Sequence, residues 1–409
     1  MKYLAICIPN YNRLDKLERL IEACASQINK HSLNAEVEIC ISDDCSPQDP
    51  SEMIMLMQKQ YSEISFTYVR NEKNEGMDYN FLNSVLISDS LYCWIIGNDD
   101  LPEENGICQA VNYLKSKVEQ VDILITPFNV YDEYDNYRSM VYPFGNTVDK
   151  TLYYNTKNLD EYHSFIRTVQ HNSALFGFLS NVIFKKQNWE KNKNRFQDKL
   201  NTIFIQMYMN IQTLQDGVVA EYIPLKIIRN YADDETNNSI DRVCKILFGL
   251  DGVVEYFFID SERKHLKQVI VDSYISGIVW ELPEEHMYKK KVRELVSGKN
   301  LFYQKYFVSA WERSTFFRNK KVFIYGAGNF GKKAYEELKQ HGAIIEGIAD
   351  SNEDKRGTKF EEYLISSVEE MVQAYKEDSF YIVVCSHLGL EEMIHTLIKN
   401  KVEHISIIT

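Results

Sequence analysis

Three features are missing from this chain, and each absence excludes a class of protein. No apolar run approaches the ~20 residues that a membrane-spanning helix requires. No cleavage-like site follows the short apolar stretch 3–8, so we expect no signal peptide. The 8 cysteines form no Cys-x-x-Cys pair. This pattern argues against a zinc site and predicts a reduced, cytoplasmic protein.

The chain also lacks an excess of positive charge. Its formal net charge is −13, which argues against nucleic acid as a substrate because phosphate binding needs a basic surface. No internal repeat or low-complexity segment is evident. A length of 409 residues with 44% hydrophobic residues predicts two or three domains with packed cores.

Short apolar runs alternate with helical patterns over the first 100 residues. Apolar runs that end in polar or acidic residues cover 4–8, 37–42, 65–70 and the stretch before Gly97. Between them, apolar residues recur at helical spacing from Leu14, over about 51–61, and over 79–88. This β-α-β-α-β-α-β order predicts a doubly wound, parallel α/β sheet.

Acidic pairs follow two of these predicted strands. The apolar run Trp94-Ile95-Ile96 breaks into Gly97-Asn98-Asp99-Asp100, and the earlier strand ends in Asp43-Asp44. Ligands of open α/β sheets bind where parallel strands end, so both pairs should meet at one edge. Paired carboxylates there suit a hard divalent cation, and the cation suits a diphosphate. The alternative is a solvated turn after each strand.

At this point the chain resembles the inverting family 2 glycosyltransferases of GT-A fold, over about its first 235 residues. Four motifs in order carry the resemblance: Ile8-Pro9-Asn10-Tyr11-Asn12-Arg13, Ile41-Ser42-Asp43-Asp44-Cys45-Ser46, Arg70-Asn71-Glu72-Lys73-Asn74-Glu75-Gly76 and Gly97-Asn98-Asp99-Asp100. The resemblance implies a nucleotide-sugar donor and a Mn²⁺ or Mg²⁺ ion. It implies that Pro9 and Tyr11 border the nucleotide base, and that Asp44, or else Asp43, binds the base or ribose.

The same resemblance implies roles for the residues after Gly97. Asp100 would be the direct metal ligand, and Asp99 its ribose or water-mediated partner, although the two roles could be exchanged. The family's first acid of an Asp-x-Asp is replaced here by Asn98, which we place on the donor nucleotide. The Gln-x-x-Arg-Trp motif of processive synthases does not occur, which favours transfer of one sugar per encounter.

The general base has no clear sequence signal. By the resemblance it should be an acidic pair that opens a helix near Asn201-Thr202, and this pair is absent. Asp198 is the nearest carboxylate and our first candidate. Its alternative role is to cap a helix over 199–214. His171 is a second candidate, although a lone histidine is more often structural.

A second nucleotide motif begins after residue 319. The predicted strand 320–325 precedes Gly326-Ala327-Gly328-Asn329-Phe330-Gly331, and Asp350 lies 350 − 331 = 19 positions further on. A Gly-x-Gly-x-x-Gly between strand and helix predicts a phosphate near Gly326, Gly328 and Gly331, with Asp350 on a ribose hydroxyl. The region resembles small Rossmann-like domains of sugar-modifying enzymes. The alternative is a tight strand–helix turn without a ligand.

Between the two regions we expect a helical connector. The predicted division is therefore a GT-A domain over 1–235, a connector over 236–318 and a Rossmann-like domain over 319–409. The stretch 286–321 holds ten Lys and Arg against two acids, with aromatics interleaved. It could contact a membrane surface, because lipid-linked acceptors lie at the cytoplasmic leaflet, or be an ordinary helix with solvated lysines.

Three functions remain open from sequence. The first is a metal-dependent inverting glycosyltransferase, UDP-sugar favoured, that acts on a glycan or lipid-linked acceptor in bacterial surface polysaccharide synthesis. The second is a bifunctional or NAD(P)-linked enzyme that works through the C-terminal glycine loop; we disfavour it, because no Tyr-x-x-x-Lys pair follows the loop. The third is an inactive sugar-nucleotide-binding protein. A homo-oligomer is compatible with each.

Overall fold

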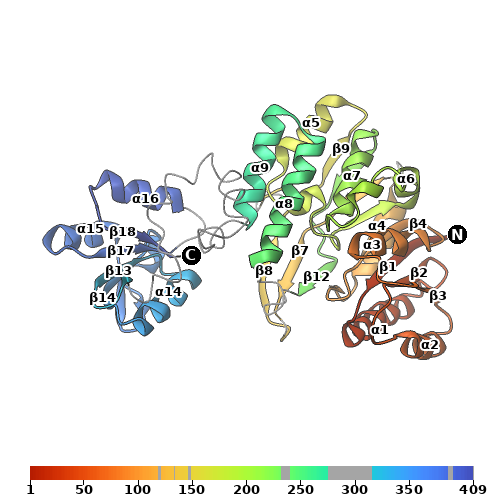
Figure 1. The fold of residues 1–409 in the computed structure, drawn as a ribbon, viewed down its shortest axis with the longest axis horizontal. Helices are drawn as coiled ribbons and strands as arrows, with labels where there is room; N and C mark the ends of the chain where they lie inside the picture. The colour runs from red at the N-terminus through yellow and green to blue at the C-terminus, as the bar shows by residue number, and fades with distance from the viewer. Residues whose placement is uncertain are drawn as a thin grey trace. The chain divides into compact units, whose positions relative to one another are not determined.

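A computed structural model of the chain describes residues 1–117, 121–132, 134–145, 149–231, 240–274, 316–385 and 390–408. The chain divides into two compact units, Met1–Ser273 and Tyr274–Thr409. Each unit is built around its own sheet (Figure 1). The α/β class predicted from the alternating pattern is confirmed, including a separate C-terminal sheet.

The N-terminal unit is organised by an eight-stranded sheet with the order β3-β2-β1-β4-β10-β6-β11-β9. Its first four strands are parallel and follow the apolar runs: β1 (Lys2–Asn10), β2 (Val37–Asp43), β3 (Ser65–Arg70) and β4 (Ser90–Ile95). Every residue of β2, and β1 from Leu4 onward, is buried, which explains why these runs are apolar on both sides.

Helices cover both faces of this parallel half. On one face α1 (Leu14–Lys30) packs against α2 (Ser51–Gln60) and α4 (Gly106–Ser116). On the other, α3 (Met77–Leu86) contacts β1 and β2 as well as α6 (Lys186–Asn192) and α7 (Ile205–Gln215). The helix expected over 199–214 therefore begins only at Ile205, and the residues before it form turns.

The second half of the sheet reverses direction. β10 (Val182–Lys185) runs antiparallel to β4 and to β6 (Ile123–Ile125), and β11 (Val219–Tyr222) joins β6 to β9 (Leu152–Asn155). α5 (Leu159–Thr168) packs on β9. A smaller sheet orders β5 (Leu101–Pro102), β12 (Ile228–Tyr231), β7 (Phe128–Tyr131) and β8 (Tyr137–Val141). It brings β12 beside the residues that follow β4, 130 positions earlier.

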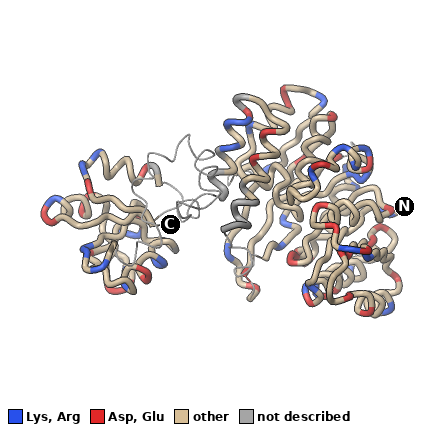
Figure 2. Tube along the Cα trace, viewed as in Figure 1, with Lys and Arg blue, Asp and Glu red and all other residues tan. Residues whose placement is uncertain are grey.

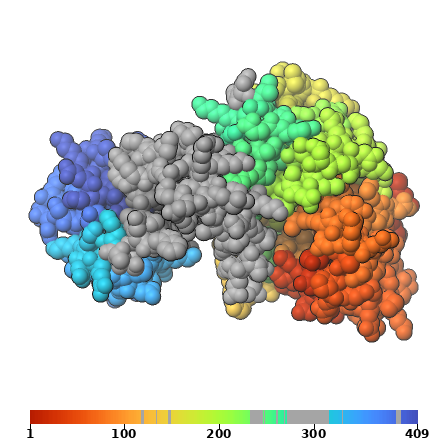
Figure 3. Space-filling view, viewed as in Figure 1, coloured from red at the N-terminus to blue at the C-terminus, as the bar shows by residue number. Residues whose placement is uncertain are grey.

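Two helices of the expected connector belong to the N-terminal unit. These are α8 (Ile240–Phe257) and α9 (Asp260–Tyr274). The rings of Tyr256 and Phe257 pack on Tyr208 of α7 at centroid distances of 5.5 and 5.6 Å. Figure 3 shows their surface in green beside the yellow-green surface of the preceding segments. Residues 275–315 lie outside the described chain, so the three-part division stays a prediction.

The C-terminal unit holds a six-stranded sheet with the order β15-β16-β14-β13-β17-β18. Its strands are β13 (Lys321–Tyr325), β14 (Ile344–Ala349), β15 (Lys359–Phe360), β16 (Tyr363–Ser366), β17 (Tyr381–Val384) and β18 (Ile405–Ile407). The helices are α14 (Asn329–Gln340), α15 (Val368–Glu377) and α16 (Leu390–Lys399). The parallel order changes direction at β13, which is where an open sheet forms a crevice.

Lys and Arg residues as well as Asp and Glu residues are distributed along the chain of each unit (Figure 2). Within the described residues, no helix combines the length and apolarity that crossing a bilayer demands. The basic and aromatic stretch 286–321 falls outside them except for residues 316–321, so its predicted membrane contact stays a prediction.

Candidate active site

A cleft of about 530 Å³ lies at the carboxyl ends of β1, β2 and β4. Many of the residues selected from sequence line it together: Pro9, Tyr11, Asp44, Asn98, Asp99 and Asp100. The opposite wall is built by residues 177–180 and by Ile203, Gln206 and Asn230. The expectation that the two acidic motifs meet at one sheet edge therefore agrees with the geometry for Asp44, Asp99 and Asp100.

Asp100 is a buried carboxylate whose hydrogen-bond donors are neutral: the side chains of Ser180 and Asn230 and the backbone amide of Tyr231. It is 3% exposed, Ser180 Oγ donates to Oδ2 at 2.5 Å and Asn230 Nδ2 donates to Oδ1 at 2.9 Å. Burial, followed by the charge of neighbouring Asp99, raises the pKa of Asp100 to about 7, although these hydrogen bonds act in the opposite direction. Asp100 is thus held in place but not charge-compensated by the side chains that touch it.

The backbone before the acids brings the two carboxylates close together. A Cβ at Gly97 would lie 2.9 Å from Asp99 Oδ1 and 3.3 Å from Asp100 Oδ2, so a larger residue here would require the carboxylates to shift. Ser180 Oγ also accepts from the Gly97 amide at 3.0 Å, which ties this turn to the opposite wall. Asp99 forms an ion pair with Arg13, and both side chains are partly exposed to the cleft.

This arrangement fits a divalent cation that binds together with a diphosphate. Carboxylate oxygens are the ligands that Mg²⁺ and Mn²⁺ prefer, and a buried acid with a raised pKa beside a second acid gains from a positive charge. Among the residues that the structure describes, no cluster of three or more His, Cys, Asp or Glu could hold a metal. Asp99 and Asp100 would therefore hold the ion with the help of phosphate oxygens and water.

The two acids after β2 have different surroundings. Asp43 is fully buried, accepts from Asn10 Nδ2 at 2.7 Å and the Ser46 amide at 3.0 Å, pairs with Arg70, and does not line the cleft. Asp44 lines it. Its carboxylate accepts hydrogen bonds of 2.8–2.9 Å from Asn71 Nδ2 and from the amides of Glu75 and Gly76. Of the two, the geometry favours Asp44 for a nucleotide contact, through the loop 71–76 that it orders.

Neutral amides connect the strand ends below the cleft. Asn98 Nδ2 donates to Asn10 Oδ1 at 2.8 Å, and Asn80 Nδ2 donates to the Asn10 carbonyl at 3.0 Å. Asn98, which replaces the family's first acid, is thus engaged with Asn10 on β1. Tyr11, by contrast, is 45% exposed, whereas Pro9, which also lines the cleft, is a buried residue of β1.

Neither candidate for the general base lines the cleft. Asp198 lies in the short 3₁₀ helix Gln197–Lys199, where its side chain is 70% exposed and pairs with Lys199 at 2.8 Å. That pair lowers the pKa of Asp198. His171 Nδ1 caps the 3₁₀ helix Asn172–Leu175 by accepting from the Ser173 amide, and burial lowers its pKa to about 4. The geometry thus supports a structural role for His171 and gives Asp198 no contact with the cleft lining.

The sequence reasoning missed three residues of the cleft architecture. Ser180 and Asn230 orient Asp100, and Asp78 holds the start of α7 by accepting from the amides of Ile203 at 2.8 Å and Ile205 at 3.2 Å. The expected cap on this helix, Asp198, lies before the turn instead. These partners are 80 to 130 positions apart in the chain, so no local sequence pattern predicts their contacts.

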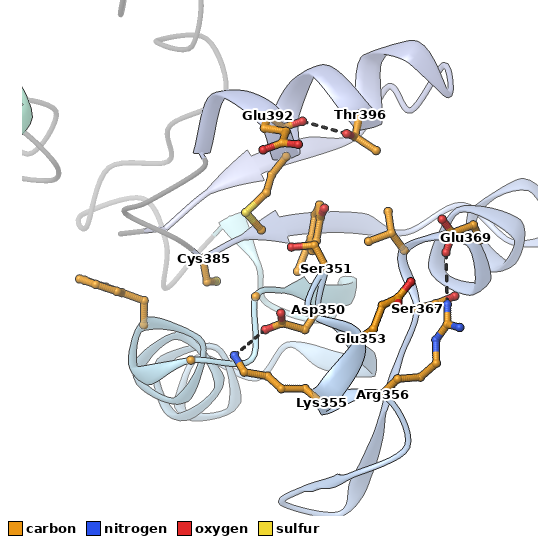
Figure 4. A pocket seen from close by; sticks show the side chains of 16 residues that line it. Asp350, Ser351, Glu353, Lys355, Arg356, Ser367, Glu369, Cys385, Glu392 and Thr396 are labelled. Carbon is orange, nitrogen blue, oxygen red and sulfur yellow. Dashed lines mark hydrogen bonds and ion pairs between the residues drawn. The ribbon is translucent and has the colours of Figure 1, made fainter. Parts of the chain in front are cut away.

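The glycine loop of the C-terminal unit borders a second cavity of about 640 Å³ (Figure 4). Asp350 lies in it and already accepts from the Ala327 amide at 2.7 Å, the Asn352 amide at 2.9 Å and Lys355 Nζ at 3.0 Å. Burial by itself would raise the pKa of Asp350, but these donors hold it below the ordinary value.

Backbone packing explains two of the three glycines. A Cβ at Gly326 would lie 2.4 Å from the Cys385 carbonyl oxygen, and one at Gly331 would lie 1.9 Å from the Gly326 carbonyl oxygen. Gly326 also has φ +116°, which favours glycine. Gly328 has open space on its Cα and lines the cavity. The second nucleotide site at these glycines and Asp350 stays a prediction.

Each of the two units contains a segment that matches a model of a known protein family. Residues 5–195 match the family model "Glycosyl transferase family 2", and residues 318–408 match "C2185-like, N-terminal". The chain is 32% identical over 192 residues to abequosyltransferase RfbV of Salmonella typhimurium. That match covers 46% of this chain and 54% of the relative, so the chain spans about half the length of the curated relative.

Solved structures show a weaker likeness. Staphylococcus aureus TarS 1-349 in complex with UDP is 13% identical, with a TM-score of 0.49 over 75% of this chain and 86% of that one. Mannosyltransferase PcManGT from Pyrobaculum calidifontis, in complex with GDP-Man and Mn²⁺, is 10% identical, with a TM-score of 0.43 over 73% and 75%. These scores carry no argument about function. The match that bears on function is the family model: residues 5–195, which include the strands that form the cleft, are similar to glycosyl transferase family 2.

Proposed function

We propose that the chain is a metal-dependent inverting glycosyltransferase. It transfers a single sugar from a nucleoside-diphosphate donor, UDP-sugar favoured, to a hydroxyl of a glycan or lipid-linked acceptor in bacterial surface polysaccharide synthesis. Support comes from the family of residues 5–195 and from the abequosyltransferase relative. The preference for UDP rests on the family resemblance alone.

The acidic pair of buried Asp100 and partly exposed Asp99 is the observation that carries the proposal. Asp100 is almost inaccessible, is oriented by Ser180 and Asn230, and has a raised pKa beside a second carboxylate. Burying a charged group in this way is costly unless a partner compensates it. A structural turn would not need a buried acid beside a second, partly exposed acid in a cleft, whereas a cation–diphosphate complex does.

Each wall of the cleft has a role in this proposal. Asp44 and the loop 71–76 that it orders bind the nucleoside, with Pro9 and Tyr11 bordering the base. Asp99 and Asp100 hold the cation, and Arg13 lies beside them to contact the diphosphate when its ion pair with Asp99 opens. When bound, the cation supplies positive charge that offsets the negative charge of the leaving diphosphate.

A single displacement inverts the anomeric centre and requires no covalent nucleophile. The acceptor hydroxyl attacks from the face opposite the diphosphate, and a base removes its proton. Among the described residues, the carboxylates that line the cleft are Asp44, Asp99 and Asp100. Asp198 and His171 lie off its lining, so we do not assign the proton acceptor to either.

The NAD(P)-linked alternative gains no support from the C-terminal cavity. A dinucleotide would need Asp350 for a ribose hydroxyl, and this carboxylate is already occupied by two backbone amides and Lys355. Four acids, Asp350, Glu353, Glu369 and Glu392, line the cavity against the two cations Lys355 and Arg356. This balance disfavours a pyrophosphate.

Calorimetric titration of UDP with and without Mn²⁺ tests the proposal. We expect Mn²⁺ to bind weakly alone and tightly with UDP, because the protein supplies two carboxylates and the diphosphate the rest. Asp100→Asn keeps the shape and the contact with Ser180 but removes the charge, so the Mn²⁺-dependent gain in UDP affinity should disappear. The control is Asp89→Asn, on an exposed side chain outside the cleft.

An unchanged Mn²⁺ effect in Asp100→Asn would contradict the metal assignment. Turnover is then measured as release of nucleoside diphosphate from a panel of UDP-, GDP-, CDP- and dTDP-sugars. Hydrolysis of at least one donor, lost in Asp100→Asn, is the expected result. A protein that binds UDP and Mn²⁺ but hydrolyses none of these donors would be the inactive binder instead.

A further inference from the structure

One residue that lines the cleft carries a buried polar atom with no partner among the described residues. Gln206, the second residue of α7, is 4% exposed, and its Oε1 receives no hydrogen bond from any residue that the structure describes. Seven other buried side-chain atoms share this condition in the described chain, and none belongs to a residue that lines the cleft. A buried carbonyl oxygen without a donor is destabilising, so its presence at a binding cleft points to a ligand.

The position of Gln206 separates it from the nucleotide site. The proposed nucleotide and metal residues follow β1, β2 and β4, which are parallel. Gln206 instead belongs to the wall built by α7 and by residues 177–180, which precede the antiparallel strand β10. Phe178, Leu179 and Ile203 give this wall apolar surface beside the amide. An apolar surface next to one hydrogen-bond acceptor suits the ring of a sugar with one hydroxyl group directed at the acceptor.

The start of α7 is held rigidly. Asp78, on α3, accepts hydrogen bonds from the amides of Ile203 and Ile205 and so fixes the turn that precedes Gln206. Within that turn Asn201 and Ile203 have φ values of +85° and +66°, which are unfavourable for a β-branched residue such as isoleucine. Strain of this kind persists where the surroundings enforce it, and it is concentrated at functional sites.

We propose that Gln206 binds a hydroxyl group of the acceptor sugar, through donation of that hydroxyl to Oε1. This inference rests on the proposed function and names a residue that recognises its acceptor. A carboxamide accepts a hydrogen bond but does not take up a proton near neutral pH. Gln206 therefore positions the acceptor and selects for a hydroxyl at one place on the ring, while the proton leaves to another group.

Paired substitutions on α7 test the role. Gln206→Met removes an unpartnered oxygen at similar volume, so the melting temperature should stay unchanged or rise. Gln212→Met is the matched control: Gln212 is also buried on α7, but its Nε2 donates to Asp216 at 2.9 Å and it does not line the cleft. This control should lower the melting temperature. A fall for Gln206→Met as large as that of the control would overturn the proposal.

Binding is measured on protein saturated with UDP and Mn²⁺. The probes are the methyl α-glycosides of mannose, galactose, glucose and rhamnose, followed by saturation-transfer NMR. We expect wild-type protein to bind at least one of them and Gln206→Met to bind it about tenfold more weakly, the effect of one lost hydrogen bond. UDP affinity should stay the same in both Met variants, and glycoside binding should stay the same in Gln212→Met.

The remaining outcomes separate two failures. If wild-type protein binds UDP and Mn²⁺ but no glycoside, or if Gln206→Met binds the glycoside as wild type does, the acceptor role of Gln206 is wrong and the proposed function stands. If Gln206→Met loses donor hydrolysis without acceptor, the amide contacts the donor sugar and the inference also fails. If wild-type protein binds no nucleoside diphosphate, the proposed function fails and the inference with it.

Discussion

The variant Asp78→Asn measures how much the Asp78 carboxylate stabilises the cleft wall at the start of α7. The native carboxylate accepts from the amides of Ile203 and Ile205, which lie 125 and 127 positions away in the chain. Burial raises the pKa of Asp78, and backbone amides of residues 201–203 and 205 offset part of that rise. The charged form is thus sustained by the start of α7.

The loss of stability expected in Asp78→Asn follows from these contacts. The asparagine oxygen can keep one amide partner, but its NH₂ group faces the other amide. One hydrogen bond to a charged group is worth about 1.5–3 kcal/mol, and the lower burial cost of a neutral amide offsets part of the loss. We therefore expect about 2 kcal/mol of destabilisation. For a unit of this size that lowers the melting temperature by roughly 4–8 °C.

Differential scanning calorimetry on the full chain measures the shift, in the transition of the N-terminal unit. Asp89→Asn is the control, since its exposed side chain contacts only the terminal amine at 3.3 Å. A surface substitution of this kind should change stability by less than about 0.5 kcal/mol. If Asp78→Asn is as stable as this control, the buried carboxylate does not hold α7, and the rigidity argued for Gln206 loses its basis.

Three further predictions concern single side chains. Ile203→Gly removes the whole half-buried side chain of four carbons, yet stability should not fall, because relief of the unfavourable left-handed backbone conformation restores about 1–2 kcal/mol. A loss above about 1 kcal/mol on urea denaturation would show that the turn is not strained. His171 has a folded pKa of about 4 against about 6.5 unfolded, so the unfolded chain takes up the proton first as pH falls. The free energy of unfolding should therefore fall by about 3 kcal/mol between pH 6.5 and 4. In His171→Asn, which keeps an acceptor for the Ser173 amide, this fall should be smaller by the same amount. If both proteins lose equal stability in acid, His171 is not the cause. Asp44→Ala should weaken UDP binding with or without Mn²⁺, because the loop 71–76 loses three hydrogen bonds; unchanged affinity by calorimetry would exclude this loop from the nucleotide site.

The parallel half of the sheet could be predicted from sequence because its signals are local. Apolar runs of buried strands and the helical spacing after Leu14 are readable within a few residues. The end of a parallel strand also determines where the residues that follow it emerge. The sequence alone therefore predicts that Asp44 and Asp100 lie at one edge of the sheet. The α/β class and the position of the acidic pair follow from this rule.

The opposite wall could not be predicted because it depends on distant pairings. Asn230 reaches Asp100 only through the small sheet that pairs β12 with β5 and β7, and each of these strands has two to four residues. Such strands give no periodic signal. Asp198 was chosen by its proximity in the chain to the expected acidic pair. In the structure, the turn before α7 is hydrogen-bonded to Asp78 through the Ile203 amide. Asp198 lies outside this turn, exposed in its own short helix.

The amide network below the cleft has a consequence for kinetics. Its side chains are buried or partly buried asparagines that carry both a donor and an acceptor and do not ionise: Asn10, Asn71, Asn80, Asn83 and Asn98. The hydrogen bonds between these amides stay the same in acid and in base, whereas those that Asn10 and Asn71 donate to Asp43 and Asp44 end on ionisable carboxylates. In a pH–rate profile of this protein, the amide part of the cleft floor should therefore contribute no ionisation of its own.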